Sequence, residues 1–317
     1  IRKDYDVADW VVYLPLDTKK NAKEFIGMVK PDLALFVKYE FWFHYLNELM
    51  YRKTPVILFS SAFRENQIFF KWYGGLFRSM LSMFSKIFVQ NEESKVLLKS
   101  ISIDSEIAFD TRFDRVWQIA ENKKSFPVIE KFKADSKIFI AGSTWKYDED
   151  LVVECIKERL LNGYKYIIAP HNIEQTRIDK LTQDISLKAL RFSELNNDNA
   201  IETDVVIVDN IGNLASLYSY AEIAYVGGGF NASVHNILEA AVYGIPVLFG
   251  PNHQKSLEAK ELFQFNVHDY PSLKNALVEL ANENTRTQIG DRNKKFVEER
   301  LGGTKKVMEA ANFHLQN

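Results

Sequence analysis

The chain has 317 residues, 46% of them hydrophobic and 26% charged, and its formal net charge at pH 7 is −2. This composition is typical of a globular protein and excludes a disordered chain, and the balanced charge gives no basis for predicting a nucleic-acid-binding protein. The length favours two domains.

A single cysteine, Cys155, excludes an internal disulfide and is typical of a reducing compartment. It lies on an apolar helix face, so we interpret it as a core residue. No apolar run reaches the length of a membrane span, and no signal peptide is visible. The chain starts at Ile1 and is already inside a folded pattern there, so we expect the natural chain to begin upstream.

Apolar runs alternate with helical patterns throughout the first 125 residues. This alternation predicts a parallel sheet in a doubly wound α/β domain. A charged segment at 121–136, which carries Pro127, is expected to hold the boundary, so that the first domain spans 1–125 and the second spans 137–300. The runs predict strands at 33–37, 55–60, 86–90 and 106–109 and helices at 19–29 and 91–99.

Lys38, Glu40 and Trp42 follow the strand at 33–37. Ligands of open α/β sheets collect at the carboxyl ends of strands, and Glu40 stands at such an end. The alternative is that Glu40 caps a helix and Trp42 belongs to the core. The aromatic segment 68–81, which also carries basic residues, could contact acyl chains and lipid phosphates or could form a buried helix pair.

The second half continues the alternation. Gly142 and Ser143 end its first strand, and their backbone and hydroxyl groups could hold an anion. The acidic run at 148–150 is interpreted as a helix cap and not as a metal site, and we find no group of residues with the types and spacing of metal ligands. The patterns predict strands at 137–141, 164–169, 205–208, 224–226 and 246–249 and helices at 234–243, 258–263, 273–282, 286–300 and 304–315.

The most informative stretch is 225–251, in which three glycines join a strand to the predicted helix at 234–243. Glycines let a ligand approach the backbone, and the first turn of a helix favours an anion. A glutamate one turn deeper is suited to sugar hydroxyls, so the stretch predicts a nucleotide site. The alternative is an ordinary turn whose glycines only permit close packing. The proposed contacts are Gly227, Gly228, Gly229, His235, Asn236 and Glu239.

The pattern GGG…HNILEAA…G-PVLFGP resembles the donor-site signature of the transferases of 3-deoxy-D-manno-octulosonic acid (Kdo), and the blocks YLPLD and FVQNEES also match that family. The resemblance extends along nearly the whole chain. It implies a GT-B fold, in which two Rossmann-like domains face a cleft and the last helix, here 301–317, packs back toward the first domain. It also implies a glycosyltransferase that moves Kdo from its cytidine monophosphate donor (CMP-Kdo) to a lipid A precursor.

This implied enzyme takes part in lipopolysaccharide biosynthesis of Gram-negative bacteria. We expect it to need neither a metal nor a cofactor and to bind no nucleic acid. Its partners would be CMP-Kdo, the lipid A precursor and the inner-membrane surface. It would lie on the cytoplasmic face of the inner membrane, either peripherally or through an anchor that precedes this chain.

The resemblance also implies roles for individual residues. The family's catalytic base lies in a Gly-Glu motif that nothing here matches, so Glu40 is only a second choice for the base. The acceptor-side candidates are Lys38, Trp42 and Arg64. The implied donor-binding residues are Gly142, Ser143, Pro170, His171, Ile211, Gly212, Gly228, Gly229, His235, Asn236 and Glu239.

Three segments depart from the family pattern. Phe109 replaces a glycine, and the loop that commonly reads Pro-Arg-His-x-Glu-Arg has His171, Asn172 and Gln175 at its first arginine, its histidine and its last arginine. A glycine-containing stretch is shortened near residues 263–264, where we expect a few residues to be absent. The turn at Ile211 and Gly212 reads either as a contact to the base edge or as a tight turn before a helix.

Two other functions stay open. Another GT-B enzyme, such as a nucleotide-sugar epimerase or a hexosamine transferase, would share the fold and prefer uridine nucleotides. A non-catalytic nucleotide-binding module would lack a base upstream of Ile1. A panel of nucleotides separates the first alternative from a Kdo transferase, and the upstream sequence separates the second. With this chain alone we expect binding of cytidine monophosphate (CMP) without sugar transfer.

Overall fold

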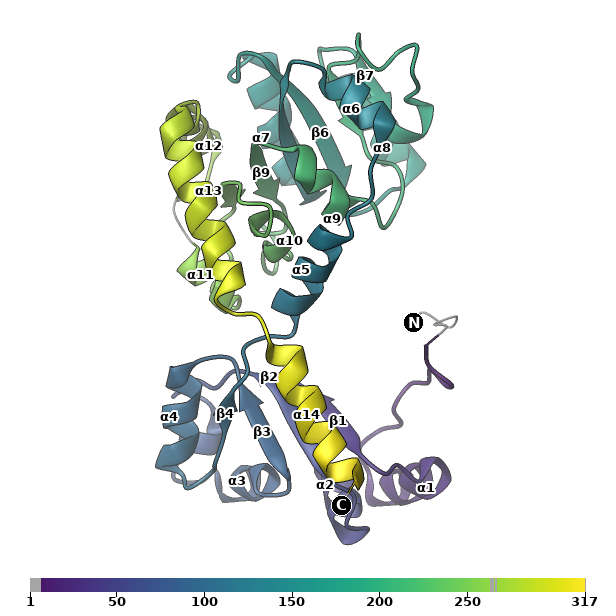
Figure 1. Cartoon of the computed structure of the whole chain (residues 1–317), viewed down its shortest axis with the longest axis vertical. Coiled ribbons are helices and arrows are strands. Elements are labelled where there is room, and N and C mark those ends of the chain that lie inside the picture. Colours follow the sequence, from purple (N-terminus) through teal and green to yellow (C-terminus); the bar gives the residue numbers. More distant parts are fainter. Residues whose placement is uncertain (1–6, 263–264, 266, 317) are drawn as a thin grey trace. The chain divides into compact units, whose positions relative to one another are not determined.

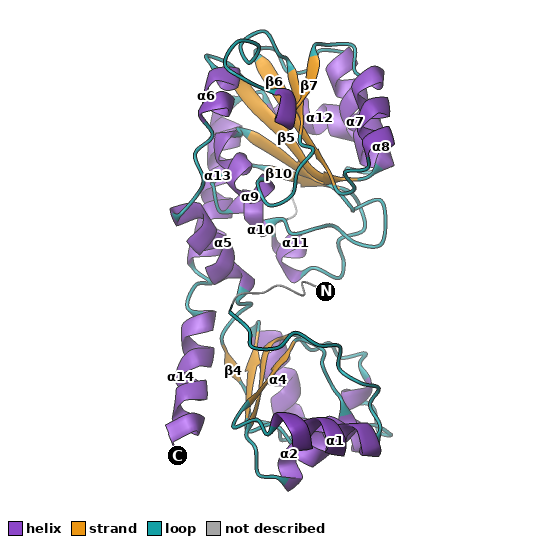
Figure 2. Ribbon diagram, turned by 90° about the vertical axis from the view of Figure 1, so that its right-hand side faces the viewer, coloured by secondary structure: helices purple, strands orange, loops and turns teal. Residues whose placement is uncertain are grey.

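The structure is a computed structural model that describes residues 7–262, 265 and 267–316 (Figure 1). Its internal contacts divide the chain into two compact units, Ile1–Thr111 with Arg300–Asn317, and Arg112–Glu299. Each unit holds one sheet flanked by helices, and every strand pairing in both sheets is parallel (Figure 2). The predicted α/β class with two parallel-sheet domains is therefore confirmed.

The first unit has a four-stranded sheet in the order β1-β2-β3-β4. Its strands are short apolar runs that bury residues such as Ile57 and Phe88. The last helix of the chain, α14, belongs to this unit because Val307 and Ala311 pack into one cluster with those two side chains. The elements are α1 (Lys19–Val29), β1 (Ala34–Val37), α2 (Phe43–Tyr51), β2 (Val56–Ser61), η1 (Ile68–Phe70), α3 (Gly75–Leu81), β3 (Lys86–Val89), α4 (Glu92–Ser100), β4 (Glu106–Ile107) and α14 (Gly303–Gln316).

The second unit has a six-stranded sheet in the order β10-β9-β5-β6-β8-β7. From β5 the chain adds β6, β7 and β8 on one side, then crosses back to place β9 and β10 on the other. The strands β5 and β9 therefore flank the point where the strand order reverses, and ligands of open α/β sheets bind beyond the carboxyl ends of such strands. The strands are β5 (Lys137–Thr144), β6 (Tyr164–Pro170), β7 (Ala189–Arg191), β8 (Val205–Ile207), β9 (Ile223–Val226) and β10 (Val247–Phe249).

Helices cover this second sheet and bury its apolar faces. Cys155 is 1% exposed on α7, so its predicted place in the core is confirmed. The helices are α5 (Arg112–Glu121), α6 (Pro127–Lys133), α7 (Lys146–Lys157), α8 (Gln175–Asp184), η2 (Phe192–Glu194), α9 (Leu214–Leu217), η3 (Tyr218–Tyr220), α10 (Leu238–Ala241), α11 (Leu257–Glu261), α12 (Tyr270–Leu280) and α13 (Glu283–Glu298).

The structure differs from the expected organisation in three places. Helix α5 packs against α9, α10 and α13, so the contacts assign it to the second unit, whereas the sequence placed residues up to 125 in the first. The helix predicted at 234–243 is wrong, because only α10 forms there. The short strand β7 and the helices α5, α6 and α8 had not been predicted. The shortened stretch expected at 263–264 lies outside the described residues.

Candidate functional site

The carboxyl ends of β5 and β9 meet at the predicted glycine loop. The N–H of Gly227 donates to the carbonyl of Gly142 at 2.9 Å, which extends the strand pairing by one residue. A Cβ at Gly227 would lie 2.4 Å from the carbonyl oxygen of Ser143 and 2.7 Å from the Cα of Thr144. Because any Cβ would clash there, only glycine fits at this position. Gly227 therefore lets the ends of β5 and β9 approach each other closely.

The other two glycines also face protein atoms. Gly228 has a φ of 89°, and its Cβ position lies 2.7 Å from Cδ2 of His235. The Cβ position of Gly229 lies 2.6 Å from the backbone of Gly250. At each of the three glycines, neighbouring protein atoms therefore occupy the space that a Cβ would need. Among the described residues the backbone N–H groups of Gly229 and Asn236 have no hydrogen-bond partner, and these two donors remain for a ligand.

Replacing Gly229 by alanine is expected to destabilise the second unit by about 1–3 kcal/mol, because the added methyl overlaps backbone that cannot rotate away. The matched exchange at Gly75, where a Cβ would meet nothing nearer than 3.9 Å, is expected to be nearly neutral. Urea denaturation followed by circular dichroism measures both changes. Equal stability of the two variants would show that the loop around Gly229 yields to a methyl group.

The segment between the glycines and α10 is a loop and not the predicted helix start. The N–H of Val234 donates to the carbonyl of Asn252 at 3.0 Å, and the N–H of His235 donates to that of Gly227 at 3.1 Å. These bonds replace the i→i−4 bonds of a helix, which explains why α10 begins only at Leu238. In the first turn of the predicted helix, which was expected to bind an anion, the N–H groups of Val234 and His235 are thus already used.

Asp148 ties this loop to helix α7. It is 1% exposed, and its carboxylate accepts hydrogen bonds from the N–H of Trp145 at 2.9 Å, the N–H of Gly228 at 3.1 Å and the hydroxyl of Tyr225 at 2.7 Å. Burial and the nearby Asp148 raise the pKa of Tyr225, which keeps that hydroxyl a donor. The predicted helix cap is confirmed, and the additional bond to Gly228 was not predicted.

Ser143 and its neighbour differ in what they can offer a ligand. Ser143 is half-buried and has a φ of 53°, a left-handed conformation that is uncommon for serine. The hydroxyl of Thr144 donates to the buried Glu149 at 3.1 Å, and Glu149 is also paired with Arg177 at 2.9 Å. Burial raises the pKa of Glu149, and Arg177 partly opposes this. The hydroxyl of Ser143 is therefore the better candidate for an anion contact.

Three aromatic rings meet beside the glycines. His171, which directly follows β6, stacks on His235 with the ring centres 4.4 Å apart, and on Trp145 at 4.7 Å. The indole N–H of Trp145 donates to Nε2 of His235 at 3.0 Å. The two predicted histidines are thus in contact, together with a tryptophan that the sequence reasoning missed. Its position after a strand at the switch point was the available signal.

Glu239 is half-buried and lies next to Asn236. The amide of Asn236 donates to Oε1 of Glu239 at 3.1 Å, whereas the Oδ1 atom of Asn236 is buried without a partner among the described residues. Burial raises the pKa of Glu239, and the bond from Asn236 opposes this only in part. Burial and then the Glu239 charge also raise the pKa of Tyr243 to about 12. A half-buried carboxylate with few partners can accept hydrogen bonds from ligand hydroxyls.

The remaining donor-side candidates lie at other strand ends of the same sheet. Pro170 is the last residue of β6, where it pairs with Thr144 of β5. Ile211 is 83% exposed, and Gly212 has a φ of 91° in the turn before α9. A Cβ at Gly142 would lie 2.0 Å from the hydroxyl of Tyr218, so this glycine too is closely packed.

The acceptor-side candidates lie at the carboxyl edge of the first sheet. The indole N–H of Trp42 donates to Glu40, and both side chains are exposed, so the alternative that Trp42 is a core residue is wrong. Lys38 is paired with the buried Asp110 at 3.1 Å. The backbone N–H of Arg64 donates to the side chain of Gln67 at 2.9 Å. In the first unit, therefore, Lys38 and Glu40 each already have a polar partner.

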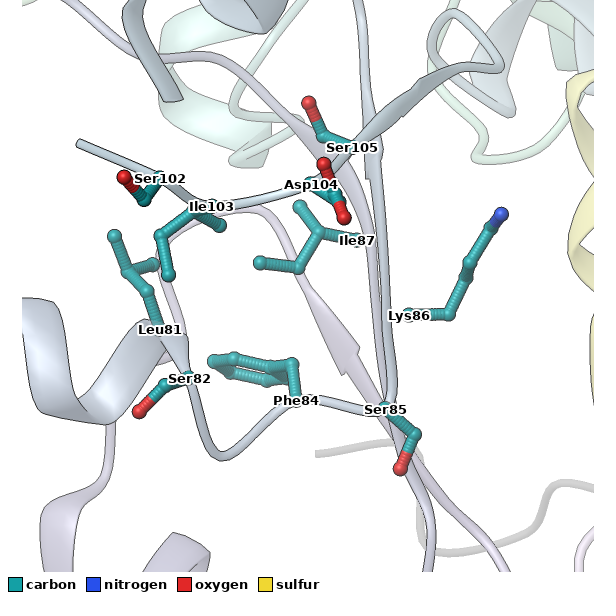
Figure 3. A pocket seen from close by; sticks show the side chains of 10 residues that line it. All are labelled: Leu81, Ser82, Phe84, Ser85, Lys86, Ile87, Ser102, Ile103, Asp104 and Ser105. Carbon is teal, nitrogen blue, oxygen red and sulfur yellow. The ribbon is translucent and has the colours of Figure 1, made fainter. Parts of the chain in front are cut away.

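A separate pocket of about 240 Å³ lies at the opposite, amino edge of the first sheet, before β3 and β4 (Figure 3). Four serines and Asp104 line it together with apolar side chains such as those of Phe84 and Ile87. None of the predicted site residues belongs to it, and ligands of open α/β sheets collect at the other edge.

The described part of the chain lacks two further features. No group of three or more histidine, cysteine, aspartate or glutamate side chains there has the arrangement of a metal site. None of the helices formed by those residues has the length and apolar character needed to cross a membrane.

Comparison with known proteins extends these observations. The family model described as "3-Deoxy-D-manno-octulosonic-acid transferase (kdotransferase)" matches residues 1–115. A bifunctional glycosyltransferase/methyltransferase of Fusobacterium nucleatum is 28% identical over 291 residues, which cover 86% of this chain and 44% of the relative. A 3-deoxy-D-manno-octulosonic acid transferase of Aquifex aeolicus is 27% identical over 301 residues, covering 92% of this chain and 77% of the relative. The chain thus spans about half of the first relative and three quarters of the second.

Solved structures resemble the fold at lower identity. The UDP-GlcNAc 2-epimerase of Neisseria meningitidis, bound to UDP-GlcNAc, has a TM-score of 0.55 and 16% identity, covering 88% of this chain and 78% of that one. The α,α-trehalose-phosphate synthase (UDP-forming) of Burkholderia vietnamiensis has a TM-score of 0.53 and 12% identity, covering 94% and 74%. At such identities these likenesses bear on the fold alone, which is of the GT-B type.

Proposed function

We propose that this chain, which belongs to the 3-deoxy-D-manno-octulosonic acid transferase family, forms the donor-binding and part of the acceptor-binding machinery of a glycosyltransferase that moves Kdo from CMP-Kdo to a lipid A precursor. The reaction belongs to lipopolysaccharide biosynthesis. The observation that carries the proposal is the half-buried carboxylate of Glu239 beside the glycine loop at the switch point of the second sheet.

The donor would bind across that loop. Its phosphate accepts hydrogen bonds from the N–H groups of Gly229 and Asn236, with the hydroxyl of Ser143 and the ring of His235 nearby. Its ribose hydroxyls donate to Glu239. Fixed donors around a leaving phosphate stabilise the negative charge that grows on it during transfer. Pro170, His171, Ile211 and Gly212 supply the remaining rim of the donor site.

The acceptor would bind to the first unit. Glu40 offers a carboxylate at the end of β1, close to Trp42, and could remove the proton from the acceptor hydroxyl. Lys38 and Arg64 would contact acceptor phosphates. Because Trp72 is 91% exposed and Leu76 is 57% exposed, the segment η1–α3 is suited to touch the inner-membrane surface. We place the enzyme on the cytoplasmic face of that membrane.

A transfer assay tests this function. The natural full-length protein is incubated with CMP-Kdo and a lipid A precursor, and the lipid product is analysed by mass spectrometry. We expect an added Kdo mass, which should be strongly reduced by Glu239→Ala. Transfer from a uridine-linked sugar, or no transfer under conditions in which the natural protein is folded, would reject the proposed reaction.

Nucleotide selectivity should follow the proposed donor. We expect CMP to bind to this chain more tightly than the uridine and adenosine monophosphates, because the family's donor carries cytidine. We also expect binding to survive a chelator, since the contacts proposed for the phosphate are N–H and hydroxyl groups. Calorimetric titration measures both results. A requirement for added magnesium would count against this phosphate site.

A further inference from the structure

The side chains of Trp145 and His235 lie edge to edge. Their ring planes differ by only 12° and their centres are 6.5 Å apart, while the indole N–H donates to Nε2 of His235 at 3.0 Å. His171 stacks over both rings, at interplanar angles of 28° and 19°. The three residues follow or flank the ends of three different strands, β5, β6 and β9, so the cluster depends on the folded sheet.

The backbone and neighbouring charges hold this cluster in place. The N–H of Trp145 donates to Asp148, that of His171 to the carbonyl of Thr144 and that of His235 to the carbonyl of Gly227. The guanidinium of Arg177, which is paired with Glu149, lies 5.9 Å from the centre of the indole ring. The rings therefore have little freedom to exchange partners.

This geometry decides where the proton of His235 can be. An indole N–H can only donate, so Nε2 of His235 must carry a lone pair. The ring is then neutral, with its proton on Nδ1. A second proton on Nε2 would place two N–H groups against each other, and it would also be opposed by burial. Among the described residues, Nδ1 has no hydrogen-bond partner, so its N–H is available to a ligand.

We infer that Trp145 is a positioning residue, which holds His235 as the neutral tautomer with the proton on Nδ1, so that His235 gives the donor phosphate a hydrogen bond and not a positive charge. This inference rests on the proposed function for its ligand, whereas the state of the ring can be tested without one. It assigns a role to a tryptophan for which the sequence predicted none.

The surrounding groups act in the same direction. Burial and the nearby His171 lower the pKa of His235, and Asp148 opposes them. The other charged groups near the cluster are Arg177 and Glu149, which neutralise each other. A pKa of His235 below its ordinary value favours the neutral ring.

Nuclear magnetic resonance of the ring nitrogens tests the positioning role directly. In the ¹⁵N-labelled chain we expect Nδ1 of His235 to be protonated and Nε2 to be unprotonated at pH 7, with a pKa below that of free histidine. In Trp145→Phe, which keeps a ring against His171, we expect a mixture of tautomers and a pKa closer to that of free histidine. Trp117→Phe on α5 is the matched control and should leave the His235 signals unchanged. A protonated Nε2 in the natural chain, or the same tautomer in Trp145→Phe, would overturn the inference.

Binding of CMP provides the second readout. At pH 8 we expect Trp145→Phe to bind CMP about three- to ten-fold more weakly, because only the fraction of His235 that keeps its proton on Nδ1 can then donate to the phosphate. This difference in affinity should be smaller at pH 6, because the His235 ring of the variant, which Trp145 no longer holds, gains a positive charge. The charge of the CMP phosphate changes with pH in the same way for both proteins. The ratio of their affinities therefore reports only the change at the His235 ring. A ratio that does not change with pH would contradict the assigned role. If the natural chain binds no CMP at all, the proposed function fails, and the tautomer measurement still decides the role of Trp145.

Discussion

Asp148→Ala is expected to destabilise the second unit by about 3 kcal/mol or more, because it leaves several buried donors without an acceptor. The carboxylate accepts from two backbone N–H groups and from the hydroxyl of Tyr225, and it is 1% exposed. Each unsatisfied buried donor costs about 1–3 kcal/mol. Thermal and urea denaturation of the purified variants measure the loss.

Asp150 supplies the control for this prediction. It lies two residues further along α7, is exposed, and among the described residues pairs only with Lys146 within one helix turn. Asp150→Ala removes the same charge and should change stability by less than about 1 kcal/mol. If both variants lose equal stability, the cause is the shared loss of charge near the helix start, and the link from Asp148 to Gly228 contributes little.

Glu239→Ala is expected to weaken CMP binding about 10- to 150-fold, because hydrogen bonds to a charged group contribute about 1.5–3 kcal/mol. Glu279→Ala, at an exposed position on α12, is the matched control and should leave the affinity unchanged. Calorimetric titration with CMP measures both. Unchanged affinity in a folded Glu239→Ala variant would remove this residue from the donor site.

The carboxylate of Glu239 should lower the stability of the folded chain at neutral pH. Burial raises the pKa of Glu239 above its unfolded value, so its contribution to stability is fully present below the ordinary glutamate pKa and is lost as the pH rises through the raised, folded-state value. Glu239→Gln should therefore be at least as stable as the natural chain at pH 7, and this advantage should shrink in mildly acid solution. If Glu239→Gln is more stable than the natural chain and also binds CMP more weakly, Glu239 is a residue that is kept for function.

The strands and the place of the site were predictable for a simple physical reason. Buried parallel strands are continuous apolar runs, and glycines at strand ends are rare enough to be informative. The run before Gly227 and the run before Gly142 both became strands, and they proved to be neighbours at the switch point. The alternation of strands and helices does not determine the strand order. The strand order decides which loops lie next to each other.

The parts that sequence reasoning missed all depend on contacts between distant segments. The helix expected at 234–243 has the right periodicity, yet backbone bonds from Val234 and His235 to residues far along the chain hold its first turns as a loop. Trp145 lies 90 positions from His235 and Asp148 lies 80 from Gly228, so no local pattern indicates either bond. The strand β7 is only half-buried at each of its three positions, so it lacks the buried apolar run that indicated the equally short β8 and β10.

Mapping the CMP-binding surface by backbone NMR tests the central claim most directly. When CMP is titrated into the ¹⁵N-labelled chain, we predict that the largest shift changes fall on Gly228, Gly229, His235, Asn236 and Glu239, at the ends of β5 and β9. The same titration of Glu239→Ala should show much smaller changes at equal nucleotide concentration. Shift changes centred on the serine-lined pocket before β3 and β4, or on any surface away from the glycine loop, would contradict the account.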